Sequence, residues 1–328
     1  MLANTTGASN VAVGAYSLDA NTTGADNVAI GTYALTRVTT ASSNTAVGTA
    51  AAQSITTGAN NVAVGYLALE ANTTGANNVA VGRLAADANT TGTFNTAVGQ
   101  NSLGTNTTGD QNVAIGSGSL YSNTTADNNT AVGQNSLFSN TTGTSNVAIG
   151  RESLCDNTTG TGNTGLGANA LEKVITGSCN TGIGRNSLFK NTADNNTAVG
   201  YYSLICNTTG TQNVALGVAV KANTTANNNI GIGYDALCVN QTGNANVAIG
   251  TDSLRNNTAS ENTSVGYVAL TANTTGGTNS AFGRGAMQTN TTGASNVAVG
   301  TNALNANTTG AQNVAVGVTA LCAGTTGD

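Results

Sequence analysis

The stretch Asn10-Val11-Ala12-Val13-Gly14 decides the fold, because it occurs in recognisable form 19 times along the 328 residues. Fifteen of the 18 intervals between its closing glycines are 17 residues long, and three are 16 residues long. The closing glycines are Gly14, Gly31, Gly48, Gly65, Gly82, Gly99, Gly116, Gly133, Gly150, Gly167, Gly184, Gly200, Gly217, Gly233, Gly250, Gly266, Gly283, Gly300 and Gly317. A fixed period of this kind is the signature of a repeat architecture.

The residues inside the phrase follow the pattern of a short strand. The position four residues before the glycine is Asn in every copy, and the position one before it is Val, Ile or Leu, with Phe282 as the exception. Between them a small residue alternates with Val or Thr. This alternation, bounded by Asn and Gly, predicts a strand, and the density of Gly, Asn and Thr disfavours a helix.

A second apolar column follows the phrase. Leu18 stands four residues after its glycine, and Leu recurs there in most copies, with Met287 in one of them. The turn phrase Asn21-Thr22-Thr23-Gly24 comes next, and its Asn and Gly tolerate a left-handed backbone. Charged residues are confined to the variable columns, so we expect these to face solvent. We expect the repeating columns, the Val/Ile column included, to face inward.

These features predict an all-β fold, a parallel β-solenoid or β-roll of about 19 coils with a 17-residue period. At roughly 4.8 Å per coil the coils would make a rod on the order of 90 Å long. Residues 1–328 are interpreted as a single repeat array without evident caps. The repeating asparagines are expected to stack into a hydrogen-bonded structural ladder. The first nine of them are Asn10, Asn27, Asn44, Asn61, Asn78, Asn95, Asn112, Asn129 and Asn146.

The small number of large apolar residues favours association of several chains. Leu, Ile, Val and Phe together make 61 of the 328 residues, which is low for a globular core. Two buried aliphatic side chains contribute about 3–6 kcal/mol per coil, whereas ordering the backbone of a coil costs about 17–34 kcal/mol. We therefore expect several chains to share a core, as in an intertwined homotrimer.

Two phrases carry a resemblance to known repeats. Asn27-Val28-Ala29-Ile30-Gly31 and Asn146-Val147-Ala148-Ile149-Gly150 resemble the head repeat of trimeric autotransporter adhesins, which implies a homotrimeric left-handed β-roll. The longer form, Asn-Thr-Ala-Val-Gly followed by Ala/Ser-Leu and Asn-Thr-Thr-Gly, is similar to repeats in phage tail-fibre proteins. It begins at Asn44, Asn95 and Asn129. The 17-residue period is longer than that of the adhesin repeat.

The composition excludes several classes of function. Charged residues make 7% of the chain, the net charge is −5 and His is absent. Without a basic patch we expect no nucleic-acid partner, and without a long apolar run we expect no membrane insertion. Met1-Leu2-Ala3 leads directly into a repeat, so we expect no signal peptide. The five cysteines are too widely spaced to pair and are expected to be free thiols, which favours folding in a reducing cytoplasm.

No motif predicts catalysis. A Ser-His or Cys-His pair and an imidazole metal ligand both require His, so we expect no enzyme, no cofactor and no metal site. The Gly-rich phrases are interpreted as solenoid turns, because they carry no Lys and precede no helix.

Two features are candidates for surface chemistry. Asn-x-Thr triplets are candidate glycosylation sites, although we favour turn chemistry as their explanation. The first five stand at Asn4, Asn21, Asn72, Asn89 and Asn106. Tyrosines recur just after the glycine and are either rim side chains or a contact surface for a receptor or glycan. They include Tyr16, Tyr33, Tyr66, Tyr201 and Tyr234.

The sequence therefore predicts a structural fibre shaft, either like a phage tail fibre on a virion or like an adhesin at a cell surface. Its partner would be the chain itself, with a cell-surface receptor or glycan as a further candidate. The alternative is a self-assembling extracellular filament of solenoids stacked end to end, with or without glycans. The third hypothesis is a module that binds ice or glycan. A measurement of thermal hysteresis would test for ice binding.

Overall fold

The computed structural model describes residues 3–323, which contain strands and turns and no helix. The chain divides into two compact units, residues 1–168 and residues 169–328. Each unit is a parallel β-solenoid in which one three-residue strand and its turns make one coil. The predicted all-β solenoid with a 17-residue period is confirmed.

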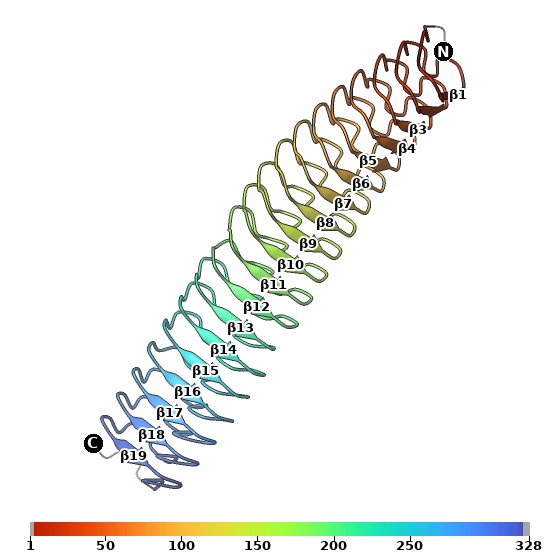
Figure 1. Ribbon diagram of the computed structural model, residues 1–328. Coiled ribbons are helices and arrows are strands. Elements are labelled where there is room, and N and C mark those ends of the chain that lie inside the picture. Colours follow the sequence, from red (N-terminus) through yellow and green to blue (C-terminus); the bar gives the residue numbers. More distant parts are fainter. Residues whose placement is uncertain (1–2, 324–328) are drawn as a thin grey trace. The chain divides into compact units, whose positions relative to one another are not determined.

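In the first unit, consecutive strands pair in parallel and in register, so that Val11, Ala12 and Val13 lie beside Val28, Ala29 and Ile30. Figure 1 shows these strands, from red to yellow-green, following one another in chain order. The strands are β1 (Val11–Val13), β2 (Val28–Ile30), β3 (Thr45–Val47), β4 (Val62–Val64), β5 (Val79–Val81), β6 (Thr96–Val98), β7 (Val113–Ile115), β8 (Thr130–Val132), β9 (Val147–Ile149) and β10 (Thr164–Leu166).

The second unit repeats this pairing, and the register survives the 16-residue intervals. Thr181, at the start of β11, pairs with Thr197 at the start of β12, only 16 residues later. The deletion is therefore absorbed in a turn. The strands are β11 (Thr181–Ile183), β12 (Thr197–Val199), β13 (Val214–Leu216), β14 (Ile230–Ile232), β15 (Val247–Ile249), β16 (Thr263–Val265), β17 (Ser280–Phe282), β18 (Val297–Val299) and β19 (Val314–Val316).

The interior of each coil is filled by one chain. The middle residue of a strand, such as Ala114, is fully buried, and so is the residue of the leucine column, such as Leu120. Ladder asparagines such as Asn112 are fully buried as well. Small, apolar and amide side chains of a single coil thus close the core without a contribution from a second chain.

The prediction that the Val/Ile column faces inward is wrong. Because successive side chains of a strand point to opposite faces, only the middle one of three can point into the coil. The flanking residues point outward, and Ile115 and Phe282 keep 40% and 41% of their surface exposed. The period-two alternation is present, but the small residue and not the branched one marks the inner face.

Three columns of non-glycine residues adopt a left-handed backbone, which the sequence does not predict. They are the residue before the ladder asparagine (Ser9, φ 57°), the second residue after the glycine (Tyr16, φ 58°) and the leucine column (Leu18, φ 51°). Such φ values cost roughly 1–2 kcal/mol for an L-residue. Hydrogen bonds between coils hold them in place; the Leu18 N–H donates to the Ala34 carbonyl at 3.0 Å.

The closing glycine is required by the next coil. A Cβ atom on Gly99 would lie 2.6 Å from the carbonyl oxygen of Gly116, and its φ is +132°. No L-residue fits this position without displacement of the adjacent backbone. The repeated glycine therefore follows from the close approach of successive coils.

Candidate functional site

The outer face of the strands is the first candidate. It consists of the first and third residues of each strand, which we call the outer strand face. Its 38 positions in 19 strands are Val, Ile, Leu, Phe, Thr or Ser, and none is charged. All of these side chains are half-buried or exposed. An uncharged, largely apolar surface of this extent is typical of an interaction face.

The ladder asparagines lie one above another inside each unit. The Oδ1 atom of Asn10 accepts hydrogen bonds from the backbone N–H of Asn27 at 2.9 Å and from its Nδ2 group at 3.2 Å. The same Nδ2 group donates to the Ala41 carbonyl at 2.9 Å. The backbone bond to Oδ1 recurs at Asn44, Asn61, Asn78, Asn95, Asn112, Asn129 and Asn146. These side chains join one coil to the next and are not available to a ligand.

The candidate glycosylation sites are mostly buried. Asn21, Asn72, Asn89 and Asn106 are at most 1% exposed. Asn89 Nδ2 donates to Asn72 Oδ1 at 2.9 Å and to the Gly92 carbonyl at 3.0 Å. A glycan on Nδ2 would remove these bonds and has no room in the coil. The glycosylation hypothesis is therefore wrong for these four residues in the folded chain, whereas Asn4 is exposed and remains a prediction.

The two threonines of the turn phrase play different roles. The hydroxyl of the first, such as Thr90, donates to the carbonyl of Thr107 in the next coil at 2.8 Å. The second, such as Thr91, is exposed. Only one of the two columns therefore presents hydroxyl groups to solvent.

The predicted tyrosines occupy two neighbouring exposed columns. The first turn column, directly after the glycine, holds Tyr66, Tyr201 and Tyr234, which are about half exposed. The second turn column holds Tyr16 and Tyr33, whose rings stack with centroids 5.1 Å apart and planes 4° from parallel. The structure brings this last pair together. It does not bring Tyr66 to either member of the pair.

The structure adds two aromatic pairs that the sequence did not indicate as pairs. They are the stacked rings of Tyr121 and Phe138, with centroids 5.3 Å apart, and the adjacent Tyr201 and Tyr202. The rings of Tyr201 and Tyr202 lie 4.1 Å apart and are tilted by 55°. The Tyr201 hydroxyl shares a hydrogen bond with that of Tyr202, which raises the pKa of Tyr201 and lowers the pKa of Tyr202. Asn186, one coil earlier, also hydrogen-bonds to Tyr202 and lowers its pKa further. Adjacent tyrosines at the start of a turn were the available sequence signal.

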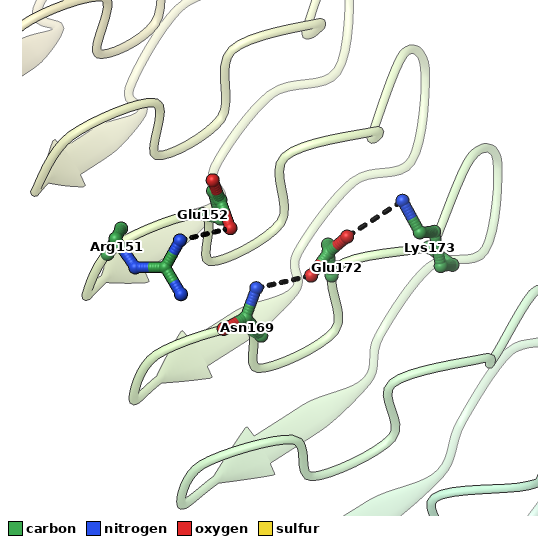
Figure 2. Close-up of polar contacts among 5 residues, drawn as sticks. All are labelled: Arg151, Glu152, Asn169, Glu172 and Lys173. Carbon is green, nitrogen blue, oxygen red and sulfur yellow. Dashed lines mark hydrogen bonds and ion pairs between the residues drawn. The ribbon is translucent and has the colours of Figure 1, made fainter.

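Charged side chains of the turns pair locally. Arg151 in the first turn column contacts Glu152 in the second, with Nη1 2.7 Å from Oε2 (Figure 2). In the other unit Asn169 donates a hydrogen bond to Glu172, three residues later, and Lys173 Nζ lies 2.7 Å from Glu172 Oε1 (Figure 2). The second turn column and the fifth turn column, five residues after the glycine, can therefore contact each other within one coil.

One charged cluster is largely buried. Asp235 is 7% exposed, and its Oδ1 lies 2.6 Å from Lys221 Nζ. Arg255 Nη2 lies 3.9 Å from the other carboxylate oxygen of Asp235, and Arg255 Nε lies 3.6 Å from Asp252 Oδ1. The hydrogen bond to Asp235 raises the pKa of Lys221. The expectation that every charge faces solvent is thus wrong for Asp235, which lies next to the turn shortened by a deletion.

Within residues 3–323 no group of three or more His, Cys, Asp or Glu side chains could hold a metal ion. The same residues contain no helix that could cross a membrane. None of the five cysteines is joined in a disulfide, as their spacing predicted, and burial raises the pKa of the Cys238 thiol.

Comparisons with known proteins add no assignment. No protein-family model matches the chain, and no curated protein is significantly similar to it.

Proposed function

We propose that this protein is the shaft of a structural fibre, which holds a tip away from a virion or a cell surface. The observation that carries the proposal is the ladder in each unit. Backbone hydrogen bonds, asparagine amides and threonine hydroxyls all connect one coil to the next. A stack held by so many bonds along one direction resists bending, which is the property that a shaft needs. The resemblance to tail-fibre and adhesin repeats supports the same function.

Three copies of the chain form the shaft in this proposal. The outer strand face supplies the interface, because it is uncharged and because solvent exposure of its branched side chains is unfavourable. Since the core of each coil is complete within one chain, the three solenoids pack through these faces and do not exchange coils. The role is structural, and no catalytic residue is assigned.

The mass of the full chain under native conditions tests the assembly. Sedimentation at micromolar concentration is expected to give a discrete particle of three chains. An open-ended polymer would favour the filament of stacked solenoids. A monomer would contradict the proposed shaft.

A charge on the outer strand face sharpens the test. Ile115→Lys combined with Ile249→Lys places one cation on this face in each unit, and the variant is expected to sediment as a folded monomer. The control is Gln100→Lys with Thr301→Lys, which adds the same charge in the first turn column. Circular dichroism of both variants reports whether the coil is intact. Equal trimer content in the two variants would place the interface elsewhere.

A further inference from the structure

The turns that follow the strands differ in charge between the two units. We call the six residues after each closing glycine the turn edge. In the first unit the turn edges contain three basic and five acidic residues, whereas in the second they contain six basic and three acidic residues. The second unit thus has a cationic edge in a chain whose net charge is −5.

Every acidic residue on the turn edge of the second unit has a cationic partner. Glu172 is paired with Lys173, Asp235 with Lys221, and Asp252 with Arg255. The remaining cations are Arg185, Lys190 and Arg284, and within residues 3–323 no carboxylate lies within ion-pair distance of them. Their charge is therefore available to an anion from outside the chain.

Exposed tyrosines stand beside two of these cations. Arg185 and Tyr201 occupy the first turn column of consecutive coils, and the N–H of Tyr202 donates to the Arg185 carbonyl at 3.2 Å. The two side chains start about 4.8 Å apart, the spacing of paired strands. Tyr201 is 49% exposed, and Tyr202 packs against its ring. The same pairing recurs with Tyr267 and Arg284, also in consecutive coils.

We propose that the turn edge of the second unit binds an acidic saccharide, with Tyr201 stacked on the sugar ring and Arg185 bound to its carboxylate or sulfate group. An exposed ring offers an apolar face to the C–H groups of a sugar, and guanidinium groups bind planar anions through paired hydrogen bonds. Asn186 and the tyrosine hydroxyls supply neutral hydrogen-bonding groups beside them. The pair formed by Tyr267 and Arg284 gives a second contact for a longer chain, which raises its apparent affinity. This inference does not rest on the proposed trimer.

The first unit supplies the matched control. Tyr66 and Arg83 also stand in consecutive coils of the first turn column, but the fifth turn column of the same two coils holds Glu70 and Asp87. In coils of the proposed site this column holds Phe189, which is neutral. Like charges beside Arg83 repel an anionic ligand, so the pair in the first unit is expected not to bind.

Calorimetric titration of the full chain with a hexamer of galacturonic acid tests the proposal. Arg185→Gln and Tyr201→Ala are each expected to weaken binding at least about tenfold, whereas Tyr201→Phe keeps the ring and changes binding less than about threefold. Arg83→Gln and Tyr66→Ala are expected to bind like the unchanged protein. Both proposed contact residues lie at the surface, so thermal melting of the variants should remain unchanged.

Two further probes distinguish saccharide recognition from simple charge attraction. Cellohexaose has the sugar rings without the charge, and hexaglutamate has the charge without the rings. Each is expected to bind at least about tenfold more weakly than the galacturonate hexamer. Absence of galacturonate binding, unchanged binding after Arg185→Gln and Tyr201→Ala, or equally tight binding of hexaglutamate would each overturn the proposal.

Discussion

The coils of the two units have the same internal structure, but the side chains that they expose to solvent differ. In both, the ladder asparagine, the small middle residue of the strand and the leucine column are buried alike. The first unit carries eight acidic and three basic residues and keeps a 17-residue period, whereas the second carries six of each and contains all three shortened intervals. The inner columns are constrained by stacking, because each residue contacts its own copy in the next coil. The outer columns are free to differ, and recognition is therefore expected there.

The closing glycine should show the largest difference between the units. Gly99→Ala places a Cβ atom 2.6 Å from a backbone oxygen, whereas the nearest atom to a Cβ on Gly217 lies at 3.3 Å, next to a deletion. We expect Gly99→Ala to lower the free energy of unfolding by about 2–6 kcal/mol and Gly217→Ala by about 1–3 kcal/mol. Urea denaturation measures both. Equal losses would mean that the shortened turn does not loosen the stacking.

Ion pairs should also differ, because one is buried and the other is not. Lys221→Met leaves Arg255 as the remaining cation beside the carboxylate of Asp235 and is expected to cost about 1–3 kcal/mol. Arg151→Met removes an exposed pair of the first unit and is expected to cost less than about 1 kcal/mol. Thermal unfolding at low and high salt measures the two. A larger loss for Arg151→Met would contradict the distinction.

Positions with a left-handed backbone allow residue types to be exchanged between equivalent positions of the two units. Val268 in the second turn column has φ 52°, where a β-branched residue is strained, and Asn135 holds the same column in the first unit with φ 54°. Val268→Asn is expected to stabilise the protein by about 1 kcal/mol and Asn135→Val to destabilise it by a similar amount. Changes of the same sign in both melting temperatures would show that backbone strain is not the cause.

The smallest expected effect concerns the acidic edge of the first unit. Burial, and then the charge of Glu70, raise the pKa of Asp87 above 3.8, while backbone hydrogen bonds lower it. A raised pKa means that this group stabilises the fold below pH 3.8 and that the contribution is lost as the pH rises through the folded-state pKa. Asp87→Asn should therefore raise stability at pH 7 by a few tenths of a kcal/mol. At pH 3 the two proteins should melt alike, and a gain that persists there would exclude ionisation as its cause.

Much of the fold could be predicted from the sequence, because particular residues must recur at a fixed spacing. Asn112 and Gly116 recur at one spacing because each must fit against its equivalent in the next coil. Which face of the strand points into the coil could not be predicted from the sequence. Ala114 and Ile115 alternate in the same way whichever of them points inward, and only the closed coil shows that its interior accommodates alanine and leaves isoleucine outside.

The candidate site was less predictable. The place of Tyr201 after a glycine predicts a surface tyrosine. Nothing in the linear sequence predicts that Asn186 contacts Tyr202 or that Asp235 is buried between Lys221 and Arg255. These contacts join residues 14 to 20 positions apart. The contacts depend on which turn is shortened and on how the following coil packs against that turn.

The sequence by itself determined that one unit repeats, that its strands pair in parallel and that cysteines and charges lie outside the repeating columns. Periodicity suffices for this, because identical segments that stack must do so in register. Only the tertiary structure decided that each coil closes its own core, that the turn asparagines are buried and that three columns adopt left-handed backbone. These properties arise from the path of the chain between strands, where hydrogen bonds to neighbouring coils outweigh the preferences of the individual residues.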